Sequence, residues 1–355
     1  MKRKALALTL IGVFILFSVE TFHTNSVNAN PLSLPELPTP IYIIENGTIE
    51  GGAGAIQQNG NVYTFIRDIN ETIEIQKDNV IIDGNGFSIT KPPDVNTDDL
   101  LTPSGWFPSI YILNKSNIII KNITFDKCYT GISVEQSSNI IIIQNTIQNG
   151  WQGIHIDSSI NCSIIGNKLT NNSHSGLNID GSYFIVAYNT ISRNQWHGGW
   201  LTLSYSNISR NDVTDNSFDY LGIGFYLYGN NSYNRIFENN FVNNEFGLAY
   251  AGAKGGSVNN TVYSNYWSNY QYDILQSNAA DAISLADQSP LSSPISTSFN
   301  PSLFSLPLLT PDVSPTPDAQ SDAESFPFMY VAPTSIILVV VIGVCLLVYF
   351  KKRKH

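Results

Sequence analysis

Short runs in which apolar and polar residues alternate fill the middle of the chain, from residue 62 to residue 275. GISVE (131–135), GIHID (153–157) and GLNID (176–180) are three of these runs, and Asn, Gly or Ser residues separate them from their neighbours. Alternation with a period of two is typical of β-strands that bury one face, and no run has the spacing of an amphipathic helix. The pattern therefore predicts an all-β region.

The runs recur at a nearly fixed interval. Asn residues that each precede a strand-like segment follow one another at steps of 23, 22, 22 and 22 residues: Asn122, Asn145, Asn167, Asn189 and Asn211. A glycine column has steps of 22 and 23 residues: Gly131, Gly153 and Gly176. Three short strands in 22–23 residues describe one coil of a right-handed, single-stranded parallel β-helix, a solenoid in which like residues stack. We expect the Asn residues to form amide ladders and the glycines to supply positive φ at corners, so both columns are architectural.

The two ends of the chain differ from this repeat. The first residues are basic, then apolar, and end at small residues suited to cleavage, which is the order of a signal peptide; an uncleaved membrane helix is the alternative. Near the other end, an uncharged apolar stretch long enough to cross a bilayer core of about 30 Å precedes a basic tail, so the C-terminus is expected in the cytoplasm. The expected organisation is a signal peptide (1–29), a leader and N-terminal cap (30–61), the β-helix (62–275), a Ser/Pro/Thr-rich stalk (276–327), a C-terminal transmembrane helix (328–350) and a cytoplasmic basic tail (351–355).

The chain has 18 basic and 28 acidic residues and a formal net charge of −10. Seven of the basic residues lie in the two terminal segments, so the part expected outside the cell is still more acidic. This balance argues against nucleic acid as a partner. The three cysteines do not make a disulfide framework. Asn-X-Ser/Thr sequons make glycosylation candidates of Asn46, Asn70, Asn114, Asn161, Asn171, Asn207, Asn230 and Asn259.

Together with the repeats, the segments YTFIRDINETIEIQKDNVIIDGNGFSI (63–89) and SNYWSNYQYD (264–273) resemble NosD-type proteins. These are carbohydrate-binding and sugar-hydrolase (CASH-like) right-handed parallel β-helix proteins, and the resemblance is to archaeal surface members with a C-terminal anchor. It covers roughly residues 41–275 and implies the fold. The family label also implies a role with copper. The residues after SNYWSNYQYD lack the Asp/Gly-rich run that would suit Ca²⁺.

One outer face of the predicted coils gathers chemically active side chains. If the first and third residues after each Gly point inward, the second and fourth point outward. The fourth positions hold Glu135, Asp157 and Asp180, which are weak catalytic candidates. The second positions and the positions two residues before each Gly supply ligand-binding candidates: Tyr129, Trp151, His155, His174, Asn178, Trp196 and Trp200. The register between residues 198 and 224 stays open, because GGWLTL carries an extra residue.

Aromatic rings next to carboxylates and amides are typical of sugar-binding surfaces, and a solvated acidic face is the alternative. Carboxylates one or two coils apart lie about 5 or 10 Å apart, which brackets the separations in retaining and inverting glycosidases. The chain lacks the Arg-Ile-Lys run of polygalacturonases, the Arg-x-Pro-x-x-Arg of pectate lyases and the Asp-Pro-His-Glu of alginate epimerases. Basic residues near the face are limited to Lys168, Arg193 and Arg210, which favours neutral glycans over uronate polymers.

The histidines do not form an expected metal site. His155 and His174 belong to columns about 13 Å apart by strand spacing, too far to share an ion. We therefore expect no metal site and no cofactor; copper is disfavoured, and Ca²⁺ stays open for the carboxylates. The favoured function is a cell-surface-anchored β-helix that binds a glycan or envelope polymer without catalysis. The alternatives are a glycoside hydrolase, lyase or epimerase, a structural or adhesive envelope rod, and a copper-related protein.

Overall fold

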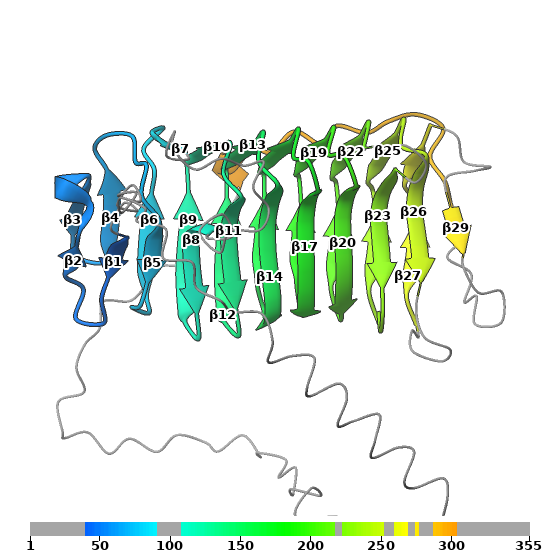
Figure 1. Ribbon diagram of the computed structural model, residues 1–355. Helices are drawn as coiled ribbons and strands as arrows, with labels where there is room; N and C mark the ends of the chain where they lie inside the picture. The colour runs from blue at the N-terminus through cyan, green and yellow to red at the C-terminus, as the bar shows by residue number, and fades with distance from the viewer. Residues whose placement is uncertain are drawn as a thin grey trace, which may run out of the picture. The chain divides into compact units, whose positions relative to one another are not determined.

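The computed structural model describes residues 40–90, 108–216, 222–251, 259–268, 274–276 and 287–303. They form a parallel β-solenoid of right-handed type with about eight turns, which confirms the predicted fold class for this part of the chain (Figure 1). The predicted signal peptide, transmembrane helix and basic tail lie outside the described residues. Within the described ranges, no helix is both long and apolar enough to cross a membrane.

Each coil contributes strands to three rows, here called A, B and C, and neighbouring strands of a row pair in parallel (Figure 1). Row A contains β1 (Ile41–Ile43), β5 (Ile73–Ile75), β8 (Pro108–Leu113), β11 (Thr130–Glu135), β14 (Gln152–Ile160), β17 (Ser175–Ser182), β20 (His197–Ser204), β23 (Ile223–Tyr228), β26 (Phe246–Ala251) and β29 (Ile274–Gln276). Row B contains β4 (Val62–Phe65), β6 (Val80–Asp83), β9 (Ser116–Lys121), β12 (Ser138–Ile143), β15 (Ser163–Ile165), β18 (Ile185–Ala187), β21 (Asn207–Ser209), β24 (Arg235–Phe237) and β27 (Thr261–Tyr263). Row C contains β7 (Ser88–Thr90), β10 (Thr124–Asp126), β13 (Thr146–Gln148), β16 (Lys168–Thr170), β19 (Thr190–Ser192), β22 (Asp212–Thr214), β25 (Asn240–Val242) and β28 (Tyr266–Trp267).

The N-terminal end of the solenoid is closed by two antiparallel pairings. Strand β2 (Ile49–Glu50) pairs with β1, and β3 (Ile56–Asn59) pairs with β4; the short 3-10 helix η1 (Gly52–Gly54) precedes β3. Strand β1 already pairs in parallel with β5, so row A begins before residue 62, the predicted start of the β-helix. The antiparallel pairs occupy backbone groups that would otherwise form an open edge.

Inward-facing aliphatic and aromatic side chains form a single core along the solenoid. One inward column of row A runs Ile132, Ile154, Leu177, Gly199 and Phe225. The pairing resolves the register that the sequence left open: Gly198 belongs to the glycine column, and Gly199 takes an inward position. A Cβ on Gly199 would lie 2.9 Å from the Phe225 ring, so the phenylalanine of the next coil fills the space that the missing side chain leaves.

Four of the five predicted ladder asparagines form a buried chain of amides. Asn145, Asn167 and Asn189 each donate from Nδ2 to Oδ1 of the Asn in the next coil, at 2.9–3.1 Å, and Asn211 extends the chain to Asn239. Asn122 differs from the expectation. It adopts φ 57° and donates to Asp83, while Ile123 N–H donates to Asn145 instead. Thr124 pairs with Thr146, so the true repeat is 22 residues, and the 23-residue step joined two different columns.

The glycines of row A are required for a reason other than the predicted one. Gly131, Gly153 and Gly176 are not among the glycines with positive φ. Each instead lies against the coil that follows it. A Cβ on Gly153 would stand 2.3 Å from the carbonyl oxygen of Gly176, and one on Gly131 would stand 2.9 Å from that of Gly153. Close backbone approach, rather than a left-handed conformation, explains the column.

Residues 287–303, which the sequence places in an extended stalk, run back along the solenoid (Figure 1). Asp287 accepts hydrogen bonds from Asn265 and from Nε1 of Trp267, which ends the amide ladder on a carboxylate. The backbone of Ile295 makes two hydrogen bonds with the Asn240 carboxamide, and the Phe299 ring lies over Gly166. The other residues of the predicted stalk lie outside the described ranges, apart from β29 at its boundary.

Candidate functional site

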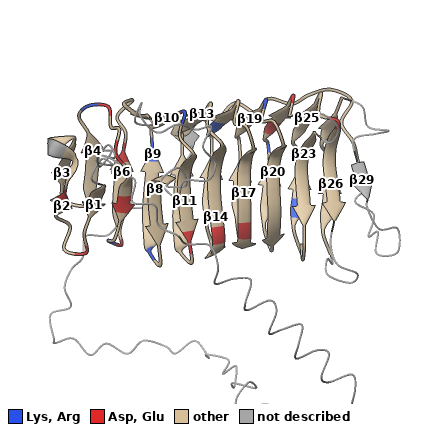
Figure 2. Ribbon diagram, in the orientation of Figure 1, with Lys and Arg blue, Asp and Glu red and all other residues tan. Residues whose placement is uncertain are grey.

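The outer face of row A brings most of the predicted site residues together. Its middle column runs in register through Tyr111, Ser133, His155, Asn178, Trp200 and Tyr226. Beside it, Glu135, Asp157 and Asp180 occupy β11, β14 and β17, where Figure 2 shows three acidic positions in line. On the other side lie Tyr129, Trp151, His174 and Trp196. We call this whole surface the row A face.

The aromatic side of the row A face is a continuous stack of rings. Tyr129 and Trp151 lie 4.7 Å apart between ring centroids and 9° from parallel, and Trp151 and His174 lie 4.3 Å apart at 27°. His174 continues to Trp196 at 4.4 Å and 45°. These separations approach the distance of about 4.8 Å between adjacent strands, so the first rings face one another along the solenoid. Their faces are covered by their neighbours, and a bound molecule meets mainly their edges.

The carboxylates differ from one another in their surroundings. Glu135 accepts a long hydrogen bond of 3.4 Å from the Tyr111 hydroxyl, and Asp157 accepts one of 3.2 Å from Ser158. A β-bulge between Ile156 and Ser159 interrupts the pairing of β14 with β17 beside Asp157. Partial desolvation by neighbouring atoms and the nearby charge of Asp157 raise the pKa of Asp180, although the residue is exposed. The carboxylates of this face therefore repel one another, and no basic side chain of the described row A strands offsets that repulsion.

The three histidines of this region are held in the neutral form. Burial lowers the pKa of His174 to about 4, and burial together with His174 lowers the pKa of His197 to about 4. Burial also lowers the pKa of His155, although Asp157 and Glu135 oppose the shift. The Nδ1 atoms of His155 and His197 are buried and have no hydrogen-bond partner, whereas Nδ1 of His174 lies 3.0 Å from the Ser175 hydroxyl.

Replacing His197 with Phe should reduce the acid sensitivity of the fold. An unfolded histidine has a pKa of about 6.5, so between pH 6.5 and 4 the unfolded chain binds more protons than the folded one, and stability falls as the pH falls. Phe keeps a ring beside Trp200 and Tyr226 but cannot be protonated. Thermal melts of wild type and His197→Phe at pH 7 and 4.5 measure the effect. An unchanged difference in melting temperature between the two pH values would contradict it.

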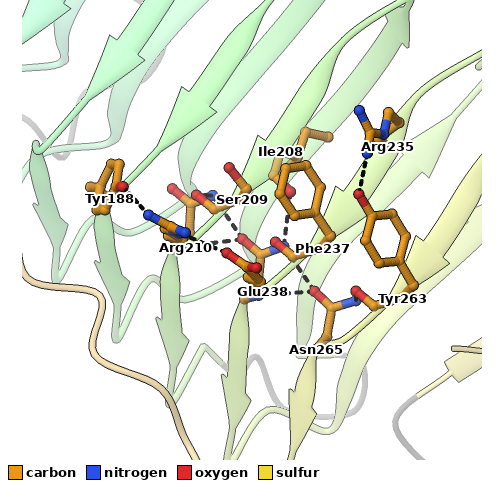
Figure 3. A network of polar contacts seen from close by, with 11 residues as sticks. Tyr188, Ile208, Ser209, Arg210, Arg235, Phe237, Glu238, Tyr263 and Asn265 are labelled. Carbon is orange, nitrogen blue, oxygen red and sulfur yellow. Dashed lines mark hydrogen bonds and ion pairs between the residues drawn. The ribbon is translucent and has the colours of Figure 1, made fainter. Parts of the chain in front are cut away.

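The basic residues that the sequence placed near this face point elsewhere in the structure. Lys168 begins β16 in row C, and Arg193 follows β19. Arg210 Nε pairs with Glu238 at 2.7 Å, and its guanidinium donates to the Tyr188 hydroxyl; Figure 3 shows this network on the turn after row B. None of the described row A strands contains Lys or Arg. The row A face therefore offers negative charge and no matching base.

Sequence reasoning missed several residues of this face. Tyr226 and Tyr228 occupy the second and fourth positions after Gly224, so the rule that found Asp157 would also have found them. Tyr111 had no such signal, because β8 contains no glycine. His197 had been considered only with His155 and His174 as a metal ligand, and it precedes its glycine by one residue. The eight glycosylation candidates are all exposed, and none lies in a row A strand. Their modification stays a prediction.

A family model described as "Periplasmic copper-binding protein (NosD)" matches residues 46–272. The chain belongs to the NosD family. The predicted resemblance to NosD-type proteins is thereby confirmed, and the match extends from β2 to β28. Among curated proteins, the comparison found no match to this NosD-family chain.

Solved structures similar to this NosD-family chain share little sequence with it. The periplasmic alginate epimerase AlgG has a TM-score of 0.41 and 11% identity, covering 69% of this chain and 80% of its own. The A-module of the mannuronan C-5 epimerase AlgE4 of Azotobacter vinelandii has a TM-score of 0.29 and 13% identity, with coverages of 62% and 69%. PfbA, a surface adhesin of Streptococcus pneumoniae, has a TM-score of 0.27 and 12% identity, with coverages of 69% and 77%.

The family description implies copper, and the described residues do not fit a copper site. No group of three or more His, Cys, Asp or Glu side chains in these ranges is placed to hold a metal ion. Cys128 and Cys162 are buried, and their thiols donate to backbone carbonyls. Burial raises the pKa of each thiol to about 11, which opposes the thiolate form that binds metals. The two methionines of the chain, Met1 and Met329, lie outside the described residues.

Proposed function

We propose that this NosD-family protein binds a glycan of the cell envelope or its surroundings through the row A face, while its C-terminal anchor holds it at the cell surface. The observation that supports this best is the joint placement of an aromatic stack and a set of carboxylates on one face. The ring edges of the stack and the exposed rings of Trp196 and Tyr228 offer apolar contact to the C–H groups of sugars, and carboxylates and amides accept hydrogen bonds from hydroxyls or donate to them. Such surfaces combine a broad apolar contact with a few polar groups that give orientation.

Two further features are consistent with ligand binding at the row A face. The sequons lie outside the row A strands, so glycans attached at those positions would not start from this face. The middle column and the carboxylates of this face also lie on regular strands, which position side chains precisely, and the aromatic stack lies in the bends immediately before those strands. Export, anchoring and glycosylation are part of the proposal. They follow from the terminal segments and the sequons.

A matched pair of arginine variants tests the location. Asn178→Arg places a long, charged side chain at the middle of the row A face, and Thr190→Arg places the same group on the exposed outer side of row C. We expect the full-length protein to bind glycans on an oligosaccharide array, Asn178→Arg to lose at least about tenfold in affinity, and Thr190→Arg to bind as wild type does. No bound glycan, or equal losses in both variants, would contradict the proposal.

Analysis of the bound oligosaccharides after incubation separates binding from catalysis. Unchanged oligosaccharides support a binding protein. Shortened, unsaturated or epimerised products would show that the carboxylates of the row A face also perform chemistry, and mutation of Asp157 to Asn would then abolish product formation.

A further inference from the structure

The aromatic stack opens at the coil that contains Trp200. Trp196 and Trp200 lie 6.1 Å apart at 26°, a wider separation than the 4.7 Å of Tyr129–Trp151 and the 4.3 Å of Trp151–His174. The rings of Trp200 and Tyr226 meet at 89° with centroids 5.0 Å apart. Trp200 and Tyr228 are also 5.0 Å apart, at 54°. Rings at steep angles leave part of their faces uncovered, in contrast to the nearly parallel pair of Tyr129 and Trp151. Trp196 and Tyr228 are 38% and 48% exposed and Trp200 is partly buried beside them, so ring surface reaches solvent around Trp200.

Polar groups flank this opening on the preceding strand. Asn178 lies directly beside Trp200 in the parallel register, and Asp180 lies beside Thr202. The two side chains point to the same side of β17, because they are two residues apart in a strand, about 7 Å along it. Among the described residues neither side chain takes part in a hydrogen bond, and Asp180 is exposed. An amide and a carboxylate thus stand free at the edge of an aromatic platform.

We propose that Trp200, Tyr228, Asn178 and Asp180 form a subsite for a single pyranose ring of a neutral glycan. This proposal rests on the proposed function and makes it more specific. The pyranose lies against the solvent-facing parts of Trp200 and Tyr228, whose rings touch each other, the Asp180 carboxylate accepts hydrogen bonds from hydroxyls, and the Asn178 carboxamide donates or accepts one. The Trp151 ring, enclosed between Tyr129 and His174, supports the stack instead of contacting the sugar face.

The charge of the row A face sets the class of glycan. Glu135, Asp157 and Asp180 have no ion-pair partner; within the described part of the chain the ion pairs are Lys121–Asp83 and Arg210–Glu238. A uronate ring beside Asp180 would place two like charges close together without a base to neutralise them, which disfavours binding. Hydroxyl-rich neutral sugars carry no such penalty.

The test compares two tryptophans of the same face in the full-length protein. Isothermal titration calorimetry uses four oligosaccharides of six residues as probes. Three are neutral, built from glucose, mannose or galactose, and the fourth is built from galacturonate. We expect at least one neutral hexamer to bind. Trp200→Ala should weaken it about tenfold or more, Asn178→Ala and Asp180→Ala should each weaken it severalfold, and Trp151→Ala should weaken it less than Trp200→Ala does. Thr190→Arg on row C is the control and should bind as wild type does. Trp200→Phe keeps a smaller ring and serves if Trp200→Ala does not fold; its affinity should lie between those of wild type and the alanine variant.

The possible results distinguish failure of the subsite from failure of glycan binding by the row A face as a whole. Binding that is lost in Trp151→Ala but retained in Trp200→Ala or Trp200→Phe would overturn the subsite and leave glycan binding intact. Binding of the galacturonate hexamer as tight as that of the neutral hexamers would overturn the charge argument. Failure of every hexamer, together with a negative array, would remove the proposed function itself.

Discussion

Asn189→Ala should lower the free energy of unfolding by about 4 kcal/mol. The Asn189 side chain is fully buried; it donates to the Ile164 carbonyl at 2.8 Å and to Asn211 Oδ1 at 2.9 Å. It also accepts from the backbone N–H and the carboxamide of Asn167. Alanine would remove these four hydrogen bonds. Asn211 Oδ1 and Asn167 Nδ2 keep other partners, whereas the Ile164 carbonyl and the Asn167 N–H lose the buried partner that the side chain supplied, each at a cost of about 1–3 kcal/mol. Denaturant unfolding followed by circular dichroism measures the change.

The exposed ladder provides the control for this prediction. Asn161 also donates to an Asn of the adjacent coil, Asn139, at 2.6 Å, but its side chain is exposed and water replaces the partner when it is lost. Asn161→Gly keeps the left-handed backbone at φ 56°. We expect a loss below about 1 kcal/mol. Similar losses at the two sites would show that burial of the amide chain does not determine its contribution.

Gly153→Ala should destabilise the solenoid by about 3 kcal/mol, at the upper end of what overpacking usually costs. The added Cβ would stand 2.3 Å from the Gly176 carbonyl oxygen, and backbone cannot rotate away as a side chain can. The two coils must therefore separate at the row A face. We expect a lower denaturant midpoint and, because Trp151 and His174 belong to the same two coils, a changed Trp fluorescence of the folded protein.

Gly86→Ala isolates the effect of close approach from that of backbone conformation. Gly86 has φ 82°, and a Cβ there would have nothing within 4 Å. Alanine at this position should cost only the strain of a left-handed residue, about 1–2 kcal/mol. If Gly86→Ala destabilised the protein as much as Gly153→Ala, steric contact between coils would not be the reason for the glycine column.

Both stability predictions bear on the proposed site. The side chains of the row A face are aligned because neighbouring coils stack in one register. The buried amide ladder and the close contacts at the glycines maintain that register. Disturbing either should change the spacing of the aromatic stack. A glycan-binding measurement on Gly153→Ala, compared with Gly86→Ala at equal folded fractions, would show how strongly the face depends on the spacing of its coils.

The sequence alone was sufficient for the solenoid and for most residues of the candidate face. Repeats of 22–23 residues with alternating apolar positions are compatible with few folds other than a β-solenoid. The alternation along a strand determines whether a side chain faces the core or the solvent, and the position in the repeat determines the coil to which the residue belongs. That is why Trp151, Asp157 and Asn178 could be placed on one surface. The same rule applied to Gly224 would have added Tyr226 and Tyr228.

Contacts between coils, and between distant segments, decided the rest. Pairing showed that Asn122 lies outside the buried ladder, because one residue of register shift exchanges a corner position for an inward one. Ring separations and angles showed that Trp151 is enclosed at 4.3–4.7 Å between two rings, whereas Trp200 lies 6.1 Å from Trp196 and meets Tyr226 edge-on; periodicity carries no information on ring rotation. Residues 287–303 have a stalk-like composition, yet Asp287, Ile295 and Phe299 find partners on coils that are far away in sequence. Such partners depend on surfaces that exist only after the coils have stacked.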